Sequence, residues 1–145
     1  MNSKLMKDPL FKKGLTLRKK ILGAKNVGHR IQQANELTIG FEEITTKAAW
    51  GIIWSRPGIS HRVRSFINLG ILTAMGQKEE LALHIRVALR NGLTRKEISE
   101  AILHCSVYCG IPRAADGKRT MCAVFEEIDK QEKNPSRLKS VNSKR

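Results

Sequence analysis

A histidine at position 84 lies in a block of sequence whose spacing would place it inside a protein. In a helix, His84 shares an inward-facing stripe with Leu81, Ile85 and Ala88. An imidazole in that position needs a hydrogen-bond partner, and Glu80 precedes it by one helical turn. Two interpretations follow. His84 is either a core histidine satisfied by a nearby carboxylate or a proton donor that Glu80 orients.

A second group of candidate residues lies upstream of this histidine. Trp50 and Trp54 are one helical turn apart and could form an apolar wall with indole N–H donors. Three arginines follow, Arg56, Arg62 and Arg64, and a guanidinium can bind a carboxylate through two parallel hydrogen bonds. The alternatives are core or interface packing for the tryptophans, and solvated or helix-capping roles for the arginines.

Glu43, the second of two adjacent glutamates, is a further acid–base candidate, and its alternative is a surface carboxylate. His104 is four residues after Glu100 and four residues before Tyr108, a spacing that favours a structural polar cluster. We expect no metal site, because the histidines and glutamates of this part of the chain lack a recognised ligand spacing.

The net charge of +14 is concentrated at the two ends of the chain. Residues 1–30 and 134–145 together carry 12 of these charges. The body has neither a basic stripe with aromatic residues nor a groove-reading motif, which argues against a dedicated nucleic-acid domain. The basic ends are expected to make weak, salt-dependent contacts with nucleic acid or another polyanion.

The length of 145 residues fits one domain with a hydrophobic core. We find no signal peptide and no apolar run of membrane length, so we expect a cytoplasmic protein that makes no membrane contact. Cys105, Cys109 and Cys122 are an odd number, which argues for thiols rather than disulfides. Cys105 and Cys109 lack the spacing of a redox or zinc pair, and we expect them to be small buried hydrophobes.

The apolar pattern predicts an all-α protein, since strand signals are absent. Residues 24–34 are expected to be a connector. Residues 36–54 are expected to form one long amphipathic helix whose inward face comprises Leu37, Phe41, Ile44, Ala48 and Ile52. Other helices are expected at 11–22, from an N-cap at Ser60 to Gly76, at 78–90, from a capping box at Thr94 and Glu97 to Tyr108, and at about 113–131.

The sequence Trp-Gly-x-x-Trp-x-Arg-Pro-Gly occupies residues 50–58 and is followed by Arg-x-Arg-Ser at 62–65. These two phrases resemble the gamma-carboxymuconolactone decarboxylase family, and the first is the more specific. The spacing of Glu80 and His84, Asn-Gly-x-Thr at 91–94 and Tyr-x-Gly-x-Pro at 108–112 extend the likeness. The resemblance covers about residues 14–125.

The resemblance implies the all-α fold of the alkyl hydroperoxidase D superfamily. A single domain at residues 14–132 would lie between a basic arm, 1–13, and a basic disordered tail, 133–145. The family likeness also implies a ring-like homo-oligomer, a homo-hexamer or homotrimer. The implied enzyme is a cofactor-independent carboxy-lyase that converts 4-carboxymuconolactone, a small dicarboxylate lactone, to β-ketoadipate enol-lactone in protocatechuate catabolism.

Decarboxylation of that lactone would leave an enolate that must be stabilised and then protonated at carbon. The candidates fit these needs. His84 would donate the proton and Glu80 would orient it, with Glu43 as a second acid–base group. Arg56, Arg62 and Arg64 would bind the carboxylates, while Trp50 and Trp54 would form the apolar wall.

Thiol peroxidases of the same superfamily carry Cys-x-x-Cys-x-x-x-His. Counting back from His84, the two cysteine positions hold Gln77 and Glu80, so we expect no peroxidase activity. Arg113 and Asp116 depart from the family's usual sequence and would point to a related lactone or keto-acid enzyme. The remaining alternative is a family member without activity that acts as a binding or scaffold protein through its basic arms.

Overall fold

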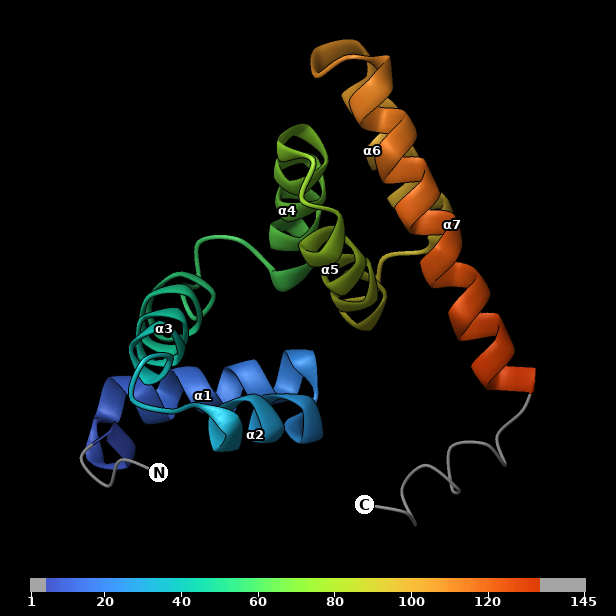
Figure 1. Cartoon of the computed structure of the whole chain (residues 1–145). Helices are drawn as coiled ribbons and strands as arrows, with labels where there is room; N and C mark the ends of the chain where they lie inside the picture. Colours follow the sequence, from blue (N-terminus) through green and yellow to red (C-terminus); the bar gives the residue numbers. More distant parts are fainter. Residues whose placement is uncertain (1–4, 134–145) are drawn as a thin grey trace. The chain divides into compact units, whose positions relative to one another are not determined.

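The computed structural model describes residues 5–133, and the regular elements in that range are all helices (Figure 1). The all-α prediction is therefore confirmed for the described part of the chain. The chain divides into two compact units, Met1–Arg64 and Ser65–Arg145. The expected disordered tail, except for Lys133, lies outside the described residues. Between residues 5 and 133, no helix is both long and apolar enough to cross a membrane.

The first unit begins with two helices joined at Gly23. The carboxylate of Asp8 caps the first helix by accepting hydrogen bonds from the N–H groups of Leu10 and Phe11 at 2.8 and 3.0 Å. Gly23 ends that helix with a φ of 95°, which favours glycine. In chain order the unit contains η1 (Leu5–Lys7), α1 (Pro9–Leu22), α2 (Ala24–Gln33), α3 (Ile39–Ile44) and η2 (Thr45–Ile53).

The structure corrects the prediction of a connector at residues 24–34, since Ala24–Gln33 form α2. Val27 and Ile31 are its buried residues, and two apolar positions are too few to produce a clear periodic pattern. The expected N-terminal arm, residues 1–13, overlaps the start of α1, where Phe11 is fully buried. Part of this basic segment therefore contributes to the core of the first unit.

The long helix expected at 36–54 is divided into α3 and the π-helical segment η2. Within this run the N–H of Trp54 donates to the carbonyl of Ala49, five residues earlier, at 2.7 Å. The predicted inward face is also wrong, since Leu37 is 84% exposed and Phe41 is 72% exposed. The buried face repeats every four residues and includes polar Thr46 as well as Trp50 and Trp54. The prediction followed apolar residues at α-helical spacing, and these lie on the exposed side of the segment.

The backbones of α1 and η2 approach each other closely at two glycines. A Cβ atom added to Gly14 would lie 2.0 Å from the carbonyl oxygen of Thr46 and 2.8 Å from the backbone nitrogen of Gly51. A Cβ atom added to Gly51 would lie 2.9 Å from the carbonyl oxygen of Leu10. Neither position has room for a side chain, so this contact fixes how η2 lies on α1.

The second unit is a set of helices around one apolar core. It takes in most of α4 (His61–Met75), and then α5 (Lys78–Arg90), α6 (Arg95–Tyr108) and α7 (Ile111–Lys133). Helices α6 and α7 lie side by side and are joined by a tight turn (Figure 1). The core draws on α4, α5, α6, α7 and the α5–α6 loop, through Leu69, Leu81, Ile85, Ala88, Leu93, Ile98, Ile102, Met121 and Val124.

The N-caps predicted at Ser60 and Thr94 are confirmed in atomic detail, whereas α1 and α7 each begin two residues before the predicted starts at 11 and 113. The hydroxyl of Ser60 accepts a hydrogen bond from the N–H of Val63 at 3.2 Å. At the start of α6 the N–H of Glu97 donates to the hydroxyl of Thr94, and the N–H of Thr94 donates to the Glu97 carboxylate, which is the predicted capping box. Cys105 is buried as expected, whereas Cys109 is only half-buried.

The glycine contact between α1 and η2 gives a stability test. Replacing Gly14→Ala should lower the free energy of unfolding by about 1–3 kcal/mol, because the added methyl group overlaps the Thr46 carbonyl. Gly28→Ala in α2 is the matched control, since nothing lies within 4 Å of the added Cβ, and it should raise the free energy of unfolding by about 0.5–1 kcal/mol. Urea unfolding measures both values, and equal effects would contradict the close approach.

Candidate active site

The two tryptophans of η2 form a compact aromatic pair. Their ring centroids are 4.9 Å apart with the ring planes inclined by 31°, and Trp50 is 4% and Trp54 6% exposed. His61, for which the sequence suggested no role, has its ring centroid 5.9 Å from that of Trp54, and its Nε2 donates to the Trp54 carbonyl at 3.0 Å. The structure therefore brings Trp50 and Trp54 together, as both the wall and the core-packing interpretations require.

Of the three candidate arginines, Arg64 has the most suitable environment for an anion. One of its terminal nitrogens donates to the carbonyl of Arg56 at 3.1 Å. Its Nε is buried and has no hydrogen-bond partner among residues 5–133. A buried donor without an acceptor costs free energy, which a bound carboxylate would recover. Arg62 is half-buried and Arg56 is exposed.

A buried charged residue that sequence reasoning missed lies one turn after Gly14 on α1. Arg18 is 2% exposed, and its Nη1 donates to the Glu42 carboxylate at 2.6 Å and to the Thr46 hydroxyl at 2.9 Å. The available signal was a single arginine within the buried stripe of an otherwise apolar helix face. These hydrogen bonds attach α1 to α3 and η2.

Glu43 belongs to a more exposed ion-pair network on the same unit. The ammonium of Lys47 lies 2.6 Å from the Glu43 carboxylate and 2.7 Å from the Asp8 carboxylate. Lys47 donates hydrogen bonds to the Asp8 and Glu43 carboxylates, which raise the pKa of Lys47, and the bond to Asp8 lowers the pKa of that carboxylate. This arrangement favours the alternative interpretation of Glu43 as a surface carboxylate over a role in proton transfer.

His84 lies half-buried on α5, beside a partner that was not predicted. The side-chain amide of Asn68 on α4 donates to Nδ1 of His84 at 3.3 Å. Because Nδ1 accepts this hydrogen bond, the proton of the neutral imidazole lies on Nε2. Asn68 stands alone as a polar side chain in the apolar run of residues 66–72, and that isolation was the available signal.

Burial and a neighbouring charge shift the pKa of His84 in opposite directions. Burial lowers the pKa of His84 below its ordinary value of 6.5, and the negative charge of Glu80 partly opposes this shift. Glu80 itself is exposed, so it affects the imidazole through its charge. The imidazole is therefore mainly neutral at pH 7. A bound dianion would favour its protonated form and would draw a proton onto it.

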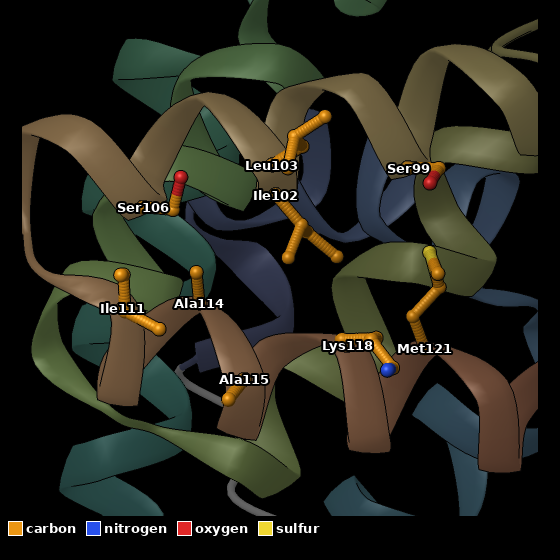
Figure 2. Close-up of a pocket in the computed structure, with 9 residues that line it drawn as sticks. All are labelled: Ser99, Ile102, Leu103, Ser106, Ile111, Ala114, Ala115, Lys118 and Met121. Atoms are coloured by element: carbon orange, nitrogen blue, oxygen red, sulfur yellow. The ribbon is translucent and has the colours of Figure 1, made fainter.

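A pocket between α6 and α7 contains none of the predicted site residues. This pocket has a volume of about 320 Å³, and Figure 2 shows its predominantly apolar walls. Its lining consists of Ser99, Ile102, Leu103, Ser106, Ile111, Ala114, Ala115, Lys118 and Met121. With a single lysine and no titratable group of acid–base type near neutral pH, this lining lacks the donor that the proposed chemistry needs.

The two departures from the family sequence lie near the start of α5. The Asp116 carboxylate pairs with Arg119 and, at 3.4 Å, with Lys78, and these partners lower the pKa of Asp116. The guanidinium of Arg113 covers Gly76, where an added Cβ would lie 2.0 Å from Nη1. Both departures therefore have structural contacts of their own within the second unit.

Comparison with known proteins matches this chain to one family. The model described as the carboxymuconolactone decarboxylase family covers residues 40–120, a range that contains all eight predicted site residues. The 4-carboxymuconolactone decarboxylase of Acinetobacter baylyi is 36% identical over 118 residues, which are 81% of this chain and 88% of that protein. The nitrosuccinic acid decarboxylase of Metarhizium robertsii is 40% identical over 126 residues, 85% of this chain and 87% of that protein.

The protonation of His84 can be measured directly. In an NMR titration, His84 should titrate below 6.5, and Glu80→Gln should move its pKa further down because the favourable negative charge is lost. The spectrum of His84→Gln assigns the signal. Because the unfolded chain takes up the proton more readily, the contribution of His84 to stability is fully present above about pH 6.5 and is lost as pH falls from there through the lower pKa of the folded state. A pKa above 6.5 would contradict this account.

Proposed function

The chain belongs to the carboxymuconolactone decarboxylase family, and from this premise we propose that it decarboxylates 4-carboxymuconolactone to β-ketoadipate enol-lactone in protocatechuate catabolism. The observation that carries the proposal is the state of His84. It is a half-buried imidazole whose Nδ1 is occupied by Asn68 and whose Nε2 holds the proton. Its neutral state before binding suits a group that must gain a proton when an anionic substrate arrives.

The proposed reaction needs no external electron acceptor. The bond between the ring carbon and its carboxylate breaks, carbon dioxide leaves, and the electron pair moves through the ring double bond onto the lactone carbonyl. The resulting enolate is then protonated at the carbon next to that carbonyl. Catalysis requires positioning of the dianion, stabilisation of the developing oxyanion and one proton donor.

The candidate residues divide these tasks among themselves in our proposal. Arg64, whose buried Nε has no acceptor among residues 5–133, binds a substrate carboxylate together with Arg62, and Arg56 is the third candidate. Trp50 and Trp54 supply an apolar wall that disfavours the charged carboxylate and favours neutral carbon dioxide. His84 protonates the enolate carbon.

The choice of substrate rests on the two named relatives. Carboxymuconolactone and nitrosuccinic acid share a pair of carboxylates and a neighbouring group that accepts electrons, a lactone carbonyl conjugated through a double bond in one and a nitro group in the other. An arginine pair and a proton donor would serve either compound. The lactone is our first choice, because the resemblance of residues 50–58 and 62–65 is to the lactone enzymes.

We further propose that the protein assembles as a homo-oligomeric ring, a homo-hexamer or homotrimer. The apolar residues of 36–54 that were predicted to face the core support this assembly. Leu37, Phe41, Ile44 and Ile52 are all exposed, and a group of exposed large apolar side chains on one segment is typical of an interface between protein chains.

The catalytic role of His84 can be tested with one variant and a matched control. His84→Ala should reduce turnover of 4-carboxymuconolactone by about 10²- to 10⁴-fold, because the enolate loses its proton donor. His104→Ala replaces an exposed histidine of the same unit and should keep near-full turnover. Loss of ultraviolet absorbance and release of carbon dioxide are followed together. Near-full activity of His84→Ala would overturn the proton-donor role of His84, and inactivity of the unaltered protein would overturn the choice of 4-carboxymuconolactone as substrate.

The exposed apolar residues of 36–54 give a second test, of assembly. Phe41→Ser combined with Ile44→Ser should convert the oligomer to smaller species, because burial of these side chains would drive association. Gln32→Ser, an exposed polar change on α2, is the control and should leave the mass unchanged. Light scattering coupled to size-exclusion chromatography measures the mass. A monomeric unaltered protein, or a double variant of unchanged mass, would contradict the proposed interface.

A further inference from the structure

We propose that Arg18 is a positioning residue that holds the π-helical segment η2 in register, so that Trp50 and Trp54 are presented to the substrate as a pair. The inference rests on the proposed function, in which these tryptophans form the apolar wall. Arg18 itself would not touch the substrate. It would act through Thr46, which lies one turn before Trp50 on the same face of η2.

The conformation of η2 needs support from outside the segment. A π-helix of nine residues is unusual, because such turns occur mostly as single bulges inside α-helices and often at functional sites. The tryptophans depend on it directly. Trp54 donates its backbone N–H five residues back to Ala49, and a return to α-helical hydrogen bonding would rotate Trp54 relative to Trp50.

Two residues of α1, one turn apart, act on Thr46. Gly14 allows the Thr46 carbonyl to approach within 2.0 Å of where a Cβ would stand, and Arg18 donates to the Thr46 hydroxyl at 2.9 Å. The backbone and the side chain of Thr46 are therefore both fixed from the same helix. Since Arg18 also donates to Glu42 at 2.6 Å, it joins the last turns of α3 to the start of η2.

The energetics favour a geometric role over a stabilising one. Removing two charges from water costs several kcal/mol, and well-packed apolar residues often replace a buried ion pair without loss of stability. Arg18 even leaves its Nε buried without a hydrogen-bond partner among the described residues, which adds to that cost. What the guanidinium provides is direction, since the N–H bonds of Nη1 are fixed in the guanidinium plane and Nη1 donates to both Glu42 and Thr46.

The experiment changes the hydrogen bond between Arg18 and Thr46 from each side in turn. Thr46→Val is isosteric and deletes only the hydroxyl that Arg18 contacts, while Thr46→Ser retains it. Arg18→Lys keeps the charge but cannot hold both Glu42 and Thr46 in the same geometry. Lys47→Gln is the matched control, because it breaks the more exposed link from Asp8 of the α1 N-cap to η2.

Two readouts are taken at a temperature where urea unfolding shows each variant to be folded. The chain has two tryptophans, so the far-ultraviolet circular dichroism couplet of their stacked indoles reports their mutual orientation. Steady-state kinetics on 4-carboxymuconolactone give kcat and KM separately. Thr46→Val and Arg18→Lys should weaken the couplet and lower kcat/KM by about 10²-fold, whereas Thr46→Ser and Lys47→Gln should retain both.

A purely structural role for Arg18 predicts a different outcome. Folded Thr46→Val and Arg18→Lys would then lose stability but keep the couplet and kcat/KM of the unaltered protein, and this result would overturn the proposal. Failure of the proposed function is separable, because it would appear as absent turnover in the unaltered protein. In that case an unchanged couplet in both variants would still overturn the positioning role, and a weakened couplet would still sustain it.

Discussion

Partial burial of His84 is the constraint on which the proposed chemistry depends. An imidazole removed from water on α5 loses part of the solvation of its charged form, and the amide of Asn68 occupies Nδ1. The two effects together favour one neutral tautomer with the proton on Nε2. In the proposed function, a substrate with two negative charges would favour the protonated imidazole, so binding and proton uptake would be linked at the same group.

In the first unit, the central structural feature is the fixed mutual orientation of the Trp50 and Trp54 indoles. Gly14 and Gly51 allow the backbones of α1 and η2 to approach closely, and Arg18 donates a hydrogen bond to the Thr46 hydroxyl at that contact. Backbone packing and a directional ion pair thus act at the same turn of η2. The outcome is a tryptophan pair that is buried, tilted and held by a helix geometry that an isolated peptide would not adopt.

Much of the fold follows from local sequence signals, and the misses have physical causes. Caps at Ser60 and Thr94 were predictable because each depends on side chains within three residues. Residues 36–54 were assigned the wrong face because the buried side contains Glu42 and Thr46, whose partner Arg18 lies 24 and 28 positions away. Asn68 was missed for the same reason, since its contact with His84 joins two different helices. Spacing along one helix cannot reveal such partners.

The most direct measurement of the central claim is the fate of the proton delivered to the enolate. With 4-carboxymuconolactone and the protein in deuterium oxide, the account predicts one deuterium at the carbon next to the lactone carbonyl, on a single face, with that selectivity lost in His84→Gln. Product labelled equally on both faces by the unaltered protein would mean that water protonates a released enolate. That result would contradict the role assigned to His84.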